Sequence, residues 1–116
     1  EGYELVGTRP VISPDGERVA YWARNGQEMF VVVDNEEGDP YGEDNQALVR
    51  DPVFSPDSVH VAYWAKTKDG YSVVVDGMEG EAYESIESNL VFDSAVTLHY
   101  RARRGTGIYL VREELE

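Results

Sequence analysis

Acidic side chains and two histidines are the residues of this chain that could do chemistry. The sequence holds 23 Asp and Glu residues, no Cys, and only His60 and His99 as histidines. The absence of Cys excludes thiolate nucleophiles and thiolate metal sites. No Ser lies in a Gly-x-Ser-x-Gly motif, so a Ser-His-Asp triad has no local support. We therefore predict structural or solvated histidines and assign no catalytic residue.

A metal site is the second chemistry that carboxylates could supply. The acidic stretch 34–44 begins Asp-Asn-Glu-Glu-Gly-Asp. An EF-hand loop needs oxygen ligands at alternating positions and Gly at the sixth, whereas Gly38 is the fifth residue of this stretch. We expect a solvated acidic loop, with no metal and no cofactor, and binding of Ca²⁺ there stays the alternative.

Three arginines, Arg101, Arg103 and Arg104, stand close together in a chain whose formal charge is −13. Side chains alternate along a strand, so Arg101 and Arg103 share one face. We predict that these two contact carboxylates of a neighbouring sheet or of a partner chain, and an anionic ligand is the alternative. The overall charge argues against nucleic acid as a partner.

These residues belong to a sequence pattern that repeats along the chain. Three phrases, Ser-Pro-Asp, Val-Ala-Tyr-Trp-Ala and Val-Val-Val-Asp, occur in this order twice, 42 residues apart. A weaker third copy follows, in which Tyr100 and Gly107 correspond to Tyr63 and Gly70 at a spacing of 37. Repeats of about 40 residues are typical of solenoids and propellers. The first copies are residues 13–15, 19–23 and 31–34, and the second copies are residues 55–57, 61–65 and 73–76.

Each copy predicts short strands joined by tight turns, because its segments are rich in Val, Tyr and Trp and are separated by Pro, Asp and Gly. Asp15 and Asp57 follow a Pro, so their carboxylates can accept backbone N–H groups and build the turn. Asp34 and Asp76 end the valine strands and are interpreted in the same way. A fourth strand is predicted to begin at the tyrosine seven residues further on, which is Tyr41 in the first copy and Tyr83 in the second.

The central strands are apolar at consecutive positions, as in Val-Val-Val, whereas a sheet with one wet face should alternate. Both faces of these sheets are therefore expected to be covered. Repeated aromatic residues such as Trp22 and Trp64 are predicted to pack between sheets.

The repeated phrases resemble the WD-like repeat of TolB-type β-propellers. The resemblance rests on Phe-Ser-Pro-Asp at 54–57, Val-Ala-Tyr at 61–63 and Val-Val-Val-Asp-Gly at 73–77. It implies an all-β chain of propeller blades, each of four antiparallel strands. It also implies a binding or scaffold propeller, or an accessory domain of a hydrolase, and it favours a periplasmic or secreted location. The motif carries no catalytic residue.

The two ends of the chain each carry only part of a predicted blade. We predict one domain over residues 1–116: a closing strand at 1–7, blades at 8–47 and 48–88, and a third blade at 89–116 without its fourth strand. Three blades are too few for a ring and would expose two blade faces and one strand edge.

Two chains related by a two-fold axis would make a six-bladed homodimer, each closing the third blade of the other. The residues predicted to make this closure are Tyr3, Leu5, Ile108 and Leu110. The alternative is that the chain is a piece of a longer propeller.

A non-enzymatic binding or scaffold module, with an unknown protein or small molecule as its ligand, is the function that these patterns favour. The alternative is a hydrolase-like or lyase-like propeller enzyme with an acidic site at the central axis. No run of about 18 apolar residues occurs, so insertion into a membrane is not expected.

Overall fold

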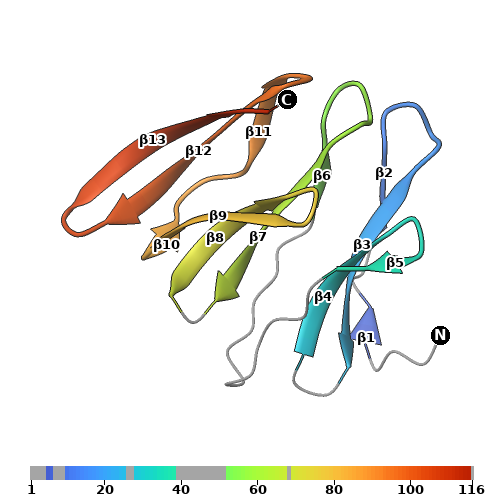
Figure 1. Ribbon diagram of the computed structural model, residues 1–116, viewed down its shortest axis with the longest axis horizontal. Helices are drawn as coiled ribbons and strands as arrows, with labels where there is room; N and C mark the ends of the chain where they lie inside the picture. Colours follow the sequence, from blue (N-terminus) through green and yellow to red (C-terminus); the bar gives the residue numbers. More distant parts are fainter. Residues whose placement is uncertain (1–4, 7–9, 26–27, 39–51, 68, 116) are drawn as a thin grey trace.

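The computed structural model describes residues 5–6, 10–25, 28–38, 52–67 and 69–115, and these residues form only strands, turns and connecting segments. All strand pairings are antiparallel. No helix in this part of the chain could cross a membrane. Figure 1 shows three sheets that follow one another in chain order. The predicted all-β class, with antiparallel sheets, is confirmed.

The first sheet is built around β3. Strands β1 and β2 pair with one side of β3, one after the other, while β4 and then β5 follow on the other side. The strands are β1 (Leu5–Val6), β2 (Val11–Ile12), β3 (Val19–Asn25), β4 (Glu28–Val33) and β5 (Glu36–Glu37).

The second sheet is a simple meander in the order β6-β7-β8-β9. In the third sheet, β10 and β11 pair with one side of β12, and β13 pairs with the other side. The strands of the second sheet are β6 (Val53–Phe54), β7 (Val61–Thr67), β8 (Gly70–Val75) and β9 (Met78–Tyr83). Those of the third are β10 (Ser85–Ile86), β11 (Val91–Ser94), β12 (Thr97–Arg104) and β13 (Gly107–Glu114).

The fourth strand of the second sheet ends at Tyr83, so the prediction that it begins there is wrong. Asp76 and Gly77 both have positive φ, 50° and 85°, and they link β8 directly to β9. A two-residue turn with positive φ at both positions returns the chain at once, without a longer loop. Tyr41, the corresponding tyrosine of the first repeat, lies outside the described residues.

The short strand β1 belongs to the first sheet. Leu5 lies opposite Arg24 of β3 and Val6 lies opposite Ala23. Strand β10 pairs with β12 of the third sheet in the same way, since Ser85 lies opposite Arg103 and Ile86 opposite Ala102. The two strands therefore correspond at the spacing of 80 that separates Leu5 from Ser85. Leu5, predicted to close the third blade of a second chain, thus pairs within its own chain instead. Tyr3, predicted in the same closing strand, lies outside the described residues.

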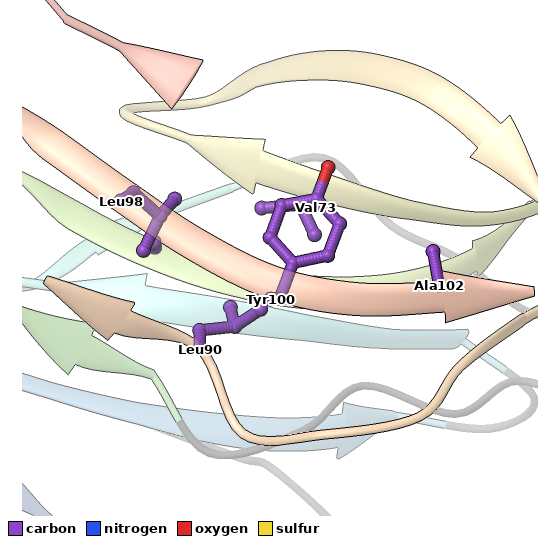
Figure 2. Packing of buried hydrophobic residues seen from close by; sticks show 6 residues of the cluster. Val73, Leu90, Leu98, Tyr100 and Ala102 are labelled. Carbon is purple, nitrogen blue, oxygen red and sulfur yellow. The ribbon is translucent and has the colours of Figure 1, made fainter. Parts of the chain in front are cut away.

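The second sheet is covered on both faces. Tyr63, Ala65 and Val74 pack against Met29 and Val31 of the first sheet. On the opposite face, Ala62 and Val73 pack in one cluster with Leu90, Leu98, Tyr100 and Ala102, which all come from the third repeat. Figure 2 shows Tyr100 beside Val73 in this cluster. The consecutive apolar residues of the valine strand are thus buried on alternate sides.

The outer faces of the array differ from each other. On the far side of the first sheet, Ala23, Phe30 and Val32 are buried. On the far side of the third sheet, Ile108 and Leu110 are exposed. We expected the outer faces of the first and third sheets both to be exposed. This prediction is wrong for the first sheet, and it holds for the third sheet at Ile108 and Leu110.

Replacing Leu98 with Ala should destabilise the chain by about 2–5 kcal/mol, because Leu98 is fully buried between the second and third sheets. The free energy of unfolding in urea measures this loss. The half-exposed Ile108 is the control, and Ile108→Ala should change stability by less than about 0.5 kcal/mol. Equal effects of the two substitutions would contradict the packing described above.

Candidate functional site

The open edge of the third sheet is the candidate site. Strand β13 pairs with β12 over eight residue pairs, from Thr97 opposite Glu114 to Arg104 opposite Gly107. No strand pairs with the other side of β13 among the residues that the structure describes. An unpaired strand presents a row of backbone N–H and C=O groups that another chain can use.

The repeat shows what this edge lacks. Thr67 lies opposite Gly70 in the second sheet, as Arg104 lies opposite Gly107 in the third, so β8 and β13 correspond at the spacing of 37. Ser72 and Val73 of β8 are only 2% and 1% exposed. The corresponding residues of β13 are Tyr109 and Leu110, which are 55% and 56% exposed. Equivalent positions are therefore buried in one sheet and open in the other.

The arginines predicted to contact carboxylates lie on the open face. Arg103 is opposite Ile108 and Arg101 is opposite Leu110, so these four side chains share one side of the sheet. The Arg103 guanidinium lies 3.2 Å from the Glu87 carboxylate. The pKa of Glu87 is lowered mainly by a hydrogen bond from the Ser85 hydroxyl and secondly by this contact with Arg103. Arg101 makes no ion pair within the described part of the chain.

The third arginine, Arg104, lies at the junction of the second and third sheets. Its guanidinium lies 4.5 Å from the ring centre of Tyr83 and donates to the Ala82 carbonyl oxygen. The Tyr83 ring also makes an edge contact with Tyr100, whose hydroxyl donates to Glu113 at 2.7 Å. Burial, and then the hydrogen bond to Glu113, raise the pKa of Tyr100, so the hydroxyl stays a donor.

The predicted turn residues Asp15 and Asp57 accept hydrogen bonds inside their own turns. The hydroxyl of the Ser two residues earlier donates to each carboxylate at 2.6 Å, and the backbone N–H two residues later donates as well. The serine hydroxyl is the main cause that lowers the pKa of each Asp, and the backbone N–H is the next. These carboxylates are therefore occupied by the turn.

The aspartates that end the valine strands are occupied in a second repeated contact. Asp34 accepts from the Arg18 side chain at 2.8 Å and from the Val19 N–H. In the next repeat, Asp76 contacts the His60 ring at 2.6 Å and accepts from the Val61 N–H at 3.0 Å. Sequence reasoning missed this pairing, although Arg18 and His60 both directly precede a Val-Ala-Tyr-Trp-Ala strand.

The histidines are held apart. His60 pairs with Asp76 in the second sheet, while His99 contacts Asp93 at 2.7 Å in the third. The Nδ1 atom of each ring thus faces an aspartate carboxylate rather than a hydroxyl nucleophile. Both side chains are engaged with a carboxylate of their own sheet, as expected of structural histidines.

The acidic stretch is only partly described, since residues 39–44 lie outside the described residues. Its first part lines a cleft of about 390 Å³ between the first two sheets, with Asp34, Glu36 and Glu37 on one side and Asp76 on the other. Within the described ranges, no three His, Asp or Glu side chains are grouped so that they could hold a metal ion.

The comparisons with known proteins return no relative. The chain matches no protein-family model, no curated protein and no solved structure. The described residues therefore define an all-β protein of three antiparallel sheets built on a repeated unit, and no strand within these residues pairs with the outer side of β13.

Replacing Asp57 with Ala should lower the melting temperature at pH 7 and flatten its dependence on pH. The folded-state pKa of Asp57 lies below its ordinary value, so this carboxylate stabilises the fold above about pH 4, and the stabilisation is lost as the pH falls through the folded pKa. Melting curves from pH 7 to about pH 2.5 should show the difference between variant and wild type shrinking with acid. Glu17→Ala, at an exposed carboxylate, is the control. A difference that is constant over this pH range would contradict the assigned role.

Proposed function

We propose that this protein is a non-enzymatic binding or scaffold module that works by accepting a fourth strand at β13. The observation that carries the proposal is the contrast between equivalent positions. The outer side of β8 pairs with β9, whereas no strand pairs with the outer side of the corresponding strand β13 among the described residues. Adding a strand to a sheet edge is a common way for proteins to recognise an extended segment.

The edge is not protected in the ways that proteins normally use. Charged residues, Pro and β-bulges blunt exposed edges. The first five residues of β13, Gly107–Val111, contain no charge and no Pro, and the register with β12 runs without a shift. A long, regular and apolar edge favours pairing with another strand.

A second copy of the chain is the partner that the repeats favour. Two chains related by a two-fold axis would form a six-bladed β-propeller as a homodimer, in which each copy completes the other's third sheet. The WD-like phrases of TolB-type propellers support this architecture. Because Ala23, Phe30 and Val32 are already buried in the single chain, most of the area gained would come from the third sheet.

Charge also supports a second copy as the partner. Residues 89–116 hold four of the ten Arg and Lys residues but only four of the 23 acids, so the rest of the chain carries the whole net charge. The guanidinium of Arg101 therefore lies on the least acidic part of the molecule. It can attract an acidic surface of another copy, and salt should weaken this attraction.

Replacing both Ile108 and Leu110 with Lys should convert a dimer into a single chain. Two ammonium groups at the edge repel an incoming apolar strand and weaken its binding by at least about tenfold, which corresponds to about 1.4 kcal/mol. Light scattering after size exclusion should give wild type a mass of twice 13.0 kDa and the double variant a mass of one chain. Met78→Lys, at an exposed apolar residue of β9, is the matched control and should leave the mass unchanged. A wild-type mass of one chain at about 100 μM would overturn the homodimer.

A further inference from the structure

Gly70, at the start of β8, shows what a fourth strand requires of its neighbour. A Cβ atom added at Gly70 would lie 2.5 Å from the carbonyl oxygen of Tyr83 in β9, which no real side chain tolerates. The φ of Gly70 is +135°, a value that also favours glycine. The backbone of β9 can therefore close against β8 only because this residue has no side chain.

Gly107 is the corresponding residue of β13, where no fourth strand is present in the described structure. A Cβ atom added at Gly107 would lie 2.9 Å from both Cζ and Oη of Tyr109. The side chain of Tyr109 thus lies against Gly107, whose φ, unlike that of Gly70, is not in the positive range. In the second sheet the residue that corresponds to Tyr109 is the small Ser72, which pairs with Ala82 of β9.

We propose that Gly107 is a docking slot for the backbone of an added strand and that the Tyr109 ring is a gate over this slot. In the single chain the ring covers the bare glycine, and it turns away when the strand pairs with β13. Tyr109 is more than half exposed, so its ring is free to move. This inference rests on the proposed function, since it specifies how the edge of β13 receives its strand.

The repeat also identifies the occupant as the N-terminal segment of a second copy. Tyr83 pairs with Tyr71 in the second sheet, and the spacings of 80 and 37 convert this pair into Tyr3 opposite Ile108. A single residue, Glu84, separates β9 from β10 on the next sheet. In the second copy a single residue, Glu4, likewise separates Tyr3 from β1, so one continuous path could join the two sheets.

The first sheet does not share the glycine. Glu28 occupies the position that corresponds to Gly70, and β5 pairs with β4 only at Val32 and Val33 within the described residues. Glycine thus stands at this position in the second repeat, where β9 pairs with β8 as far as Tyr83, and in the third repeat.

A disulfide between two chains tests the register. Directly opposed residues of antiparallel strands have Cα atoms about 4.5–5.5 Å apart, which suits a disulfide. One variant carries Tyr3→Cys, and a second variant, made longer by a tag so that the two can be told apart, carries Ile108→Cys. After mild oxidation the two variants should form a mixed disulfide, and no other thiol can compete because the natural sequence contains no Cys. Gly2→Cys is the control, because a shift of one residue points the thiol to the opposite face. Equal yields from Tyr3→Cys and Gly2→Cys would overturn the proposed occupant.

Substitutions at the two glycines test the slot. Gly70→Ala should destabilise the single chain, whereas Gly107→Ala should leave the urea midpoint unchanged, since the atoms nearest to its methyl group belong to the half-exposed side chain of Tyr109. Gly107→Ala should nevertheless weaken dimerisation at least about tenfold, because the methyl group blocks the added backbone. Unchanged dimerisation of Gly107→Ala would overturn the slot.

Tyr109→Ser tests the gate, because it gives β13 the residue that β8 has at this position. Dimerisation should tighten at least about threefold, since the slot is then open in the free chain. A weaker dimer would overturn the gate. A wild-type dimer whose Tyr3→Cys and Ile108→Cys variants fail to form the mixed disulfide would overturn the occupant and leave the proposed function intact, whereas a wild-type mass of one chain would overturn both.

Discussion

The structure depends on covering both faces of strands that are apolar on both sides. In β8, Val73 faces the third sheet and Val74 faces the first, and both are fully buried. A lone sheet cannot satisfy such a strand, because one of its faces would meet water. The repeats therefore have to stack, and the stability of each sheet depends on its neighbours.

Two sets of polar contacts align the stacked sheets. Arg18 binds Asp34 in its own sheet and also donates to the carbonyl oxygens of Ser58 and Val59 in the second. The turn of the first sheet is thereby held against the turn of the second. The third sheet has no Ser-Pro-Asp turn, and its junction uses Tyr83, Tyr100 and Arg104 instead.

Among the described residues no strand pairs with the outer side of β13, and the proposed function rests on this edge. The carboxylates that first suggested chemistry are held in turns and strand ends, as Asp57 and Asp76 are. The proposed function rests instead on backbone groups and exposed apolar side chains of the edge strand β13.

The sequence by itself determined the central strands of each repeat, the repeat and the turn aspartates, because each depends on residues close together in the chain. Pro14 and Asp15 specify a turn wherever the sheet is placed, and alternating burial follows from Val-Val-Val. Only the tertiary structure decided that β1 lies beside β3, that Phe30 and Val32 are buried on the far side of the first sheet, and that Arg18 crosses to the second. The position of the Tyr109 ring over Gly107 was decided in the same way. These features depend on which distant segments meet, and a pattern of neighbouring residues carries no information about that choice.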